Sequence, residues 1–169
     1  FAMPASIMRP NNFDPNKKYP LIVFVYGGPS APVVSNSWNR DTWFNQILLD
    51  RGFMVAKVDN SSATAISKKL ENTVLKQQAS DGELNDLVDA VQWMKKQSYV
   101  DPERVGMWGW SGGGSMSLNA IFRYPDLYAT AVAVAFVSDQ RFYDTIYQER
   151  YMGLPKDNEE GYTQGSPIT

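Results

Sequence analysis

The sequence contains no cysteine and no histidine among its 169 residues. Without cysteine, disulfide bonds play no part in the stability of this chain. Thiolates and imidazoles are the main zinc ligands, and the acidic residues show no spacing of the kind that binds calcium. We therefore expect neither a metal ion nor an organic cofactor.

Long apolar runs and an excess of positive charge are absent as well. The chain has 16 basic and 18 acidic residues and a net charge of −2, which gives no footprint for nucleic acid or an anionic membrane surface. No apolar run approaches the length of a membrane span. With 43% hydrophobic and 13% aromatic residues, the chain has ample material for the core of one domain.

Apolar runs that predict strands alternate with amphipathic runs that predict helices. This order is typical of an α/β fold with a mostly parallel sheet covered by helices on both faces. Binding sites in such sheets form at the carboxyl ends of strands, where Tyr26, Asp59, Ser111 and Val137 are expected. The predicted strands cover residues 21–26, 53–58, 104–108 and 129–137, and the predicted helices cover residues 42–50, 84–94, 116–124 and 142–152. Residues 61–79 predict a loop with a short helix, and Ser80 and Glu83 are spaced as a capping box.

The pentapeptide Gly109-Trp110-Ser111-Gly112-Gly113 follows a predicted strand and precedes a predicted helix. A Gly-x-Ser-x-Gly motif in this setting is typical of the nucleophile elbow of α/β-hydrolases. The glycines permit a tight turn, and the serine takes a strained conformation that presents its Oγ to a substrate carbonyl. The alternative is a glycine-rich turn that only packs a helix closely against a sheet.

Acyl transfer to a serine also needs hydrogen-bond donors for the developing oxyanion. The backbone N–H of Gly112 is the first candidate, because it follows the nucleophile at the start of a helix. The second donor is expected from the turn after the first predicted strand, either the Tyr26 hydroxyl or a backbone N–H of that turn. Tyr26 could equally be a core aromatic that ends a strand.

Three stretches together resemble one enzyme family. They are Val25-Tyr26-Gly27-Gly28-Pro29, Gly109-Trp110-Ser111, and residues 142–155, which read FYDTIYQERYMGLP. The combination is similar to the catalytic domain of prolyl oligopeptidase-family serine peptidases, and most of all to their dipeptidyl-peptidase-IV-like branch. The resemblance implies an exopeptidase that removes dipeptides from a peptide substrate, often after proline or alanine.

The resemblance also implies roles for individual residues. Ser111 would be the nucleophile, and the Tyr26 hydroxyl and Gly112 N–H would form the oxyanion hole. Tyr143 and Tyr147, one helical turn apart, would line the pocket for the residue before the cut, with Val137 at its base. Packing of a helix face is the alternative for the two tyrosines.

This sequence departs from that family at several positions. Relatives usually carry an aromatic residue at the position of Gly112, tryptophan at that of Gln140 and proline at that of Phe136. The loop after Asp59-Asn60 usually continues with Arg-Gly, and here it reads Ser61-Ser62. These differences predict a pocket that is roomier and more polar than usual in the family.

The acid and base of an α/β-hydrolase follow the serine, each after a later strand. Only one predicted strand follows Ser111, no histidine exists, and the later aspartates fall too early for the acid's loop. Those aspartates are Asp126, Asp139, Asp144 and Asp157; loop capping or a surface ion pair is the better interpretation of Asp139 and Asp144. We therefore expect residues 1–169 to be part of an α/β-hydrolase domain whose triad acid, base and propeller domain lie elsewhere in a longer polypeptide.

Three functions remain open on the sequence alone. The first is a peptidase that acts through an acyl-enzyme on Ser111, and the second is an esterase or acyl hydrolase with the same elbow. The third is a non-catalytic protein or fragment that keeps the fold without a base; the chain by itself is expected to be nearly inactive. A monomer and a homo-oligomer are both compatible with the sequence.

Overall fold

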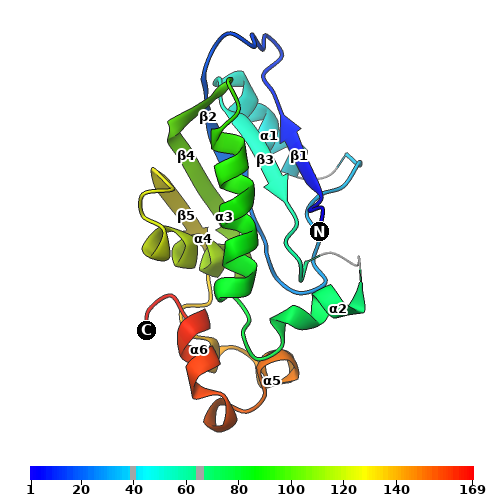
Figure 1. Cartoon of the computed structure of the whole chain (residues 1–169), viewed down its shortest axis with the longest axis vertical. Coiled ribbons are helices and arrows are strands. Elements are labelled where there is room, and N and C mark those ends of the chain that lie inside the picture. Colours follow the sequence, from blue (N-terminus) through cyan, green and yellow to red (C-terminus); the bar gives the residue numbers. More distant parts are fainter. Residues whose placement is uncertain (39–40, 64–66) are drawn as a thin grey trace.

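The computed structural model describes residues 1–38, 41–63 and 67–169, and its centre is a five-stranded sheet (Figure 1). The strand order is β1-β3-β2-β4-β5. The strands are β1 (Ala5–Met8), β2 (Tyr19–Phe24), β3 (Met54–Val58), β4 (Val100–Trp110) and β5 (Thr130–Val134). All pairs are parallel except β1 with β3. The antiparallel β1 was not predicted, because its four residues sit in a turn-rich segment with little periodicity.

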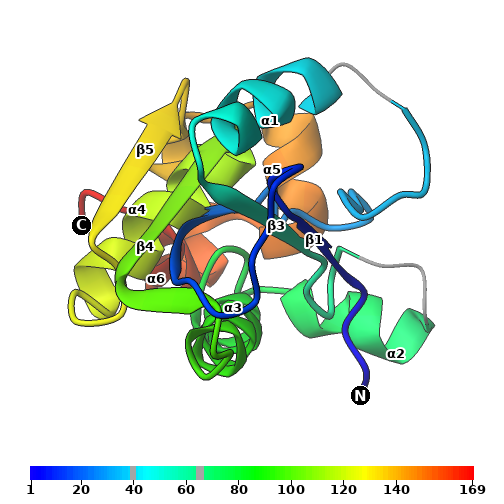
Figure 2. The same ribbon diagram turned by 90° about the horizontal axis from the view of Figure 1, so that it is seen from above.

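Helices cover both faces of the sheet, as the sequence predicts. Helix α1 lies on one face, and α3 and α4 lie on the other (Figure 2). The helices are α1 (Asp41–Asp50), α2 (Lys68–Glu71), α3 (Asp81–Lys95), α4 (Gly112–Arg123), α5 (Thr145–Met152) and α6 (Glu159–Gly165), with 3₁₀ turns η1 (Asn72–Val74), η2 (Gln140–Phe142) and η3 (Pro155–Asp157). Of the helices formed by described residues, none is long and apolar enough to cross a membrane.

The main core lies between the sheet and the pair α3 and α4. Alternate residues along β2 and directly after it point to this side, where Leu21, Val23 and Val25 are fully buried. Helix α3 presents an apolar stripe to them at intervals of three and four residues. That stripe consists of Leu84, Leu87, Val91 and Met94. Burial of these side chains fixes the sheet that carries the nucleophile elbow.

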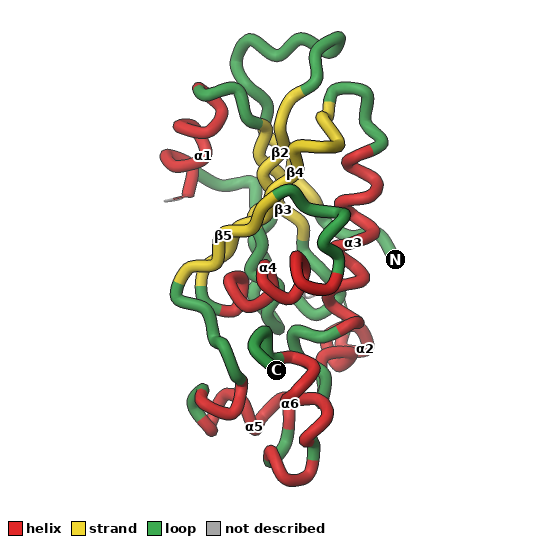
Figure 3. The backbone as a smooth tube through the Cα atoms, turned by 90° about the vertical axis from the view of Figure 1, so that its left-hand side faces the viewer, coloured by secondary structure: helices red, strands yellow, loops and turns green. Residues whose placement is uncertain are grey.

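Helices α5 and α6 lie together beyond the carboxyl ends of the parallel strands (Figures 1 and 3). The helix predicted over residues 142–152 begins later, at Thr145, because the Asp144 side chain accepts a hydrogen bond from the Tyr147 N–H and caps it. In the segment 61–79, the predicted short helix is α2, and residues 64–66 lie outside the described residues. The strand predicted over 129–137 is shorter and forms an edge of the described sheet.

The predicted capping box at the start of α3 is wrong, because Glu83 serves another purpose. Its carboxylate accepts hydrogen bonds from the Ser62 hydroxyl and from the Ala79 N–H. The Ser80 side chain makes no cap and donates to the Gln77 carbonyl instead. Glu83 is only 2% exposed, and it ties the segment after β3 to the start of α3.

Burial raises the pKa of the Glu83 carboxyl from 4.5 to about 7, a direction that the nearby Asp86 reinforces and the two hydrogen bonds oppose. The folded-state pKa lies above the unfolded one, so the neutral Glu83 carboxyl is favoured in the folded protein. Its contribution to the free energy of unfolding is fully present below about pH 4.5 and is lost as pH rises through 7. We expect a loss of roughly 3 kcal/mol in the free energy of unfolding across this window.

The variant Glu83→Gln should flatten the dependence of the free energy of unfolding on pH between pH 5 and 8, measured by urea unfolding of the complete polypeptide. The exposed control Glu103→Gln should leave it unchanged. Equal slopes for wild type and Glu83→Gln would contradict the prediction.

Candidate active site

Ser111 stands between β4 and α4 with φ 55° and ψ −118°, a conformation that residues with a side chain rarely adopt. Its N–H donates to the Val134 carbonyl, 2.9 Å away, and its carbonyl accepts from the N–H groups of Gly114 and Ser115. These bonds hold the strained residue against β5 on one side and α4 on the other. The strained serine that the motif predicts is therefore present.

Two glycines of the motif allow α4 to approach the sheet. A Cβ on Gly109 would lie 2.3 Å from the Gly113 backbone, and a Cβ on Gly113 would lie 2.1 Å from the Val25 carbonyl oxygen. Such distances exclude any side chain at either position. Gly112 differs, because a Cβ there would lie 3.7 Å from the Tyr26 ring, which is an ordinary contact. The space around residue 112 therefore does not require glycine there, although relatives usually carry an aromatic residue at this position.

The groups expected to act on a carbonyl have no partner among the residues that the structure describes. This holds for the Ser111 hydroxyl, the Tyr26 hydroxyl and the Gly112 N–H. The Tyr26 ring lies beside Gly112, so both donors lie next to the elbow. All three residues line one cavity of about 70 Å³. An unpaired serine hydroxyl beside two unpaired donors is an arrangement suited to acyl transfer.

The same cavity brings together all six residues predicted for the site. Val137, Tyr143 and Tyr147 line it with the three residues of the elbow region. The rings of Tyr143 and Tyr147 meet edge to face, with centroids 5.5 Å apart and an angle of 86°. Tyr143 precedes α5 and does not lie on it, so the two tyrosines are not one helical turn apart as the sequence suggested. The cause is the capping residue Asp144, which starts the helix between them.

Burial also changes the pKa of the Tyr147 hydroxyl. Loss of solvent raises the pKa of its hydroxyl well above the ordinary value, and the neighbouring hydroxyl of Tyr26 adds to the shift. The hydroxyl accepts a hydrogen bond from Gln78 Nε2, 2.8 Å away. Tyr147 is therefore a neutral wall of the cavity that keeps its own proton for donation.

Ser115 is a supporting residue that sequence reasoning missed. Its Oγ donates to the Val137 carbonyl at 2.8 Å and accepts from the Val137 N–H at 3.0 Å. These two bonds fix Val137, which lines the cavity, to the helix that starts at the elbow. Ser115 is one helical turn after Ser111, a spacing that could have signalled a position facing the same side.

Three glutamines complete the cavity: Gln78, Gln140 and Gln148. Gln140 was recognised as a departure from the family, and it lines the cavity. That this pocket is roomier and more polar than in relatives stays a prediction. Gln78 and Gln148 gave no signal, because single glutamines in a loop and on a helix are ordinary. All three are at least nine-tenths buried. Their hydrogen bonds hold the loop after η1, η2 and α5 together.

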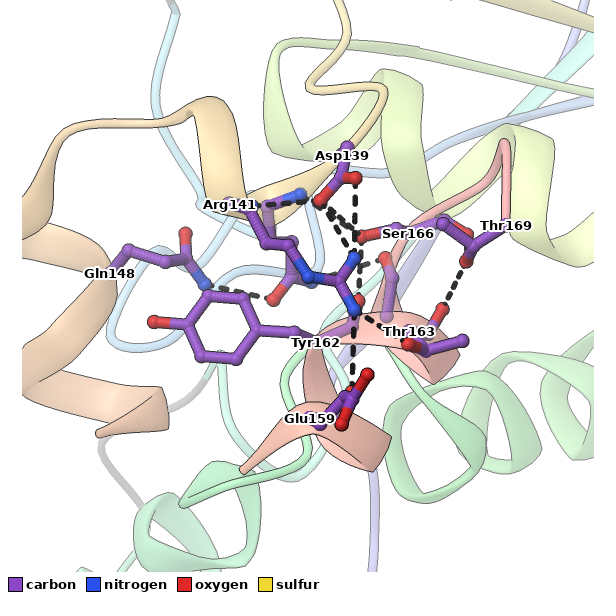
Figure 4. A network of polar contacts seen from close by, with 10 residues as sticks. Asp139, Arg141, Gln148, Glu159, Tyr162, Thr163, Ser166 and Thr169 are labelled. Atoms are coloured by element: carbon purple, nitrogen blue, oxygen red, sulfur yellow. Dashed lines mark hydrogen bonds and ion pairs between the residues drawn. The ribbon is translucent and has the colours of Figure 1, made fainter. Parts of the chain in front are cut away.

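The polar contacts behind the cavity anchor α6 (Figure 4). The Asp139 carboxylate pairs with the Arg141 guanidinium at 3.2 Å and accepts from the Arg141 N–H. Arg141 also donates to the Thr163 hydroxyl, while Ser166 Oγ accepts from the Gln140 N–H. The interpretation of Asp139 and Asp144 as capping and ion-pairing residues is thus confirmed.

Other polar residues at strand ends lie outside the cavity. The Asp59 carboxylate accepts from the N–H groups of Val33 and Val34, and its pKa is raised mainly by burial. Ser61 and Ser62, the departure after Asp59-Asn60, bond to the carboxylates of Asp86 and Glu83. These residues hold the surrounding loops in place and do not line the cavity that contains Ser111.

Comparisons with known proteins match this geometry. Residues 38–169 match the model of the prolyl oligopeptidase family. The chain is 37% identical over 168 residues to dipeptidyl peptidase 8 of Mus musculus and 36% identical to that of Homo sapiens, covering 98% of this chain and 19% of each relative. The crystal structure of Porphyromonas gingivalis dipeptidyl peptidase 4 superimposes with a TM-score of 0.90 at 34% identity, covering 98% of this chain and 23% of that one. The chain thus spans about a fifth of the length of these curated relatives. It carries a mostly parallel α/β-hydrolase sheet with a serine elbow after β4, and it belongs to the prolyl oligopeptidase family.

Proposed function

We propose that this chain is the nucleophile-bearing part of a serine peptidase that removes dipeptides from the amino end of peptides. The observation that carries the proposal is the cavity in which Ser111 faces two unpaired hydrogen-bond donors, the Tyr26 hydroxyl and the Gly112 N–H. The names of the relatives, which are dipeptidyl peptidases, support the choice of substrate.

The reaction follows from these positions. Ser111 Oγ attacks the scissile carbonyl, and its proton passes to a general base. The carbonyl oxygen becomes an oxyanion that accepts hydrogen bonds from the Tyr26 hydroxyl and the Gly112 N–H. As this intermediate collapses, the base gives its proton to the leaving nitrogen, which releases the shortened peptide as the amine and leaves the dipeptide as an ester on Ser111. Water then hydrolyses the ester and restores the serine.

The general base and its acid partner are not supplied by this chain in the proposed mechanism, because the sequence has no histidine. We propose that residues 1–169 are one part of an α/β-hydrolase domain, and that the triad histidine and aspartate and a propeller domain belong to the remainder of a longer polypeptide. A serine without its base retains only the contribution of binding and of the oxyanion hole.

The experiment is a comparison of substrates with the complete polypeptide. We expect release of the arylamine from dipeptidyl arylamides with alanine, proline or serine as second residue, and covalent labelling of Ser111 by a fluorophosphonate. Turnover of a short-chain acyl ester alone would identify an esterase. Neither turnover nor labelling, together with no histidine anywhere after Ser111, would identify a non-catalytic protein.

A further inference from the structure

Three carboxamides line part of the cavity beside Ser111, and we call this part the glutamine floor. Gln78 follows η1, Gln140 begins η2, and Gln148 lies on α5, so three separate segments converge there. Gln140 and Gln148 are each 4% exposed, and Gln78 is 9% exposed. Burial of a carboxamide costs free energy unless its donors and acceptors form hydrogen bonds.

The hydrogen bonds fix the direction of each carboxamide. Gln140 Nε2 donates to the carbonyls of Gln78 and Gly165, at 3.0 and 3.1 Å. Gln148 Nε2 donates to Gln78 Oε1 at 3.0 Å and to Gln140 Oε1 at 2.8 Å. Both protons of each of these two amides are used, and turning either group over would bring like atoms together.

One acceptor is left over. Gln148 Oε1 makes no hydrogen bond within the part of the chain that the structure describes, although the residue is almost fully buried. Figure 4 shows the Gln148 nitrogen directed into the network and the oxygen directed away from it. The residue lines the cavity, as does Tyr147, whose hydroxyl proton also has no acceptor among the described residues.

We propose that this glutamine floor makes the enzyme selective for a small hydroxyl-bearing residue, serine or threonine, immediately before the scissile bond. The inference rests on the proposed peptidase function. A substrate hydroxyl can donate to Gln148 Oε1 and accept from the Tyr147 hydroxyl, which satisfies both unpaired groups. An apolar side chain of the same shape would exclude water from both groups without replacing its hydrogen bonds.

Hydrogen bonding, and not the size of the cavity, separates this substrate class from proline. The cavity has a volume of about 70 Å³, which is more than one water molecule needs. Serine and threonine side chains have two or three heavy atoms beyond Cα. The proline ring is similar in size but offers no hydrogen-bond donor to the floor.

The test uses isosteric pairs of substrates with the complete polypeptide. The substrates are alanyl-X-aminomethylcoumarins in which X is serine or 2-aminobutyrate, threonine or valine, and proline. In each of the first two pairs a hydroxyl is replaced by a methyl group. We expect kcat/KM to be about tenfold or more higher for the hydroxyl member, and serine to exceed proline.

The variant Gln148→Met should bring the ratio for serine over 2-aminobutyrate close to one, while Gln92→Met, an exposed control on α3, should leave it unchanged. If Gln148→Met does not fold, the wild-type ratios decide alone. Equal rates within each pair, or proline as the best substrate, would overturn the selectivity and leave the peptidase function standing. Absence of any hydrolysis and of labelling at Ser111 would overturn both.

Discussion

Replacement of Ser111 by alanine in the complete polypeptide is expected to lower kcat for a dipeptidyl arylamide on the order of 10⁵-fold or more. The Ser111 hydroxyl is the group at the elbow that can form the acyl-enzyme. Among the described residues Ser30 also has a positive φ, but it lies in the loop after β2, whereas Ser111 stands directly between β4 and α4. The measurement is kcat by arylamine release, with fluorophosphonate labelling as an independent readout that should disappear.

The control for this variant is Ser37→Ala, because Ser37 is exposed and does not line the cavity. It should retain wild-type kcat and labelling. Residual activity of Ser111→Ala above about one per cent of wild type would contradict the assignment of the nucleophile. A change in the unfolding temperature should be small, since the strained backbone at position 111 is carried equally by alanine.

Replacement of Tyr26 by phenylalanine is expected to lower kcat by about 10² to 10³-fold with little change in KM. The substitution removes one hydroxyl and keeps the ring that packs beside Gly112, so the walls of the cavity remain. Because the oxyanion carries its full charge only near the transition state, the loss should fall on kcat and leave ground-state binding nearly intact.

Tyr124→Phe is the matched control, since the Tyr124 hydroxyl bonds to Asn85 and Tyr124 does not line the cavity. Steady-state kinetics of both variants on one arylamide give the comparison. A kcat for Tyr26→Phe within about threefold of wild type would place the second oxyanion donor elsewhere. The backbone N–H groups of the Gly27-Gly28 turn would then be the candidates, as the sequence alone allowed.

The elbow was predictable because its chemistry is local. A tight turn that exposes a serine needs glycine at fixed distances from it, and the structure gives the reason at Gly109 and Gly113, where a Cβ has no space. The central strands were predictable for a similar reason, since continuous apolar runs such as that of β2 are stable only when both faces are covered. Residue types in a short window decide both features.

The floor of the cavity was decided by tertiary structure alone. Gln78 and Gln148 are 70 residues apart in the chain, and their carboxamides meet only because α5 packs against the loop after η1. The same is true of Glu83, whose spacing from Ser80 predicted a cap while its partners are Ser62 and Ala79. A polar side chain takes whichever partner the fold brings near it, and when it is buried that partner must be found.

Sequence therefore determined the strand–turn–helix that carries Ser111, the donor expected from Gly112, and the family to which the chain belongs. Tertiary structure decided that Tyr143 stands outside α5, that Ser115 holds Val137, and that three glutamines close the cavity. The physical reason is the range of the interactions. Backbone strain and glycine contacts act between neighbours, whereas the hydrogen bonds of buried amides join segments that only the folded sheet brings together.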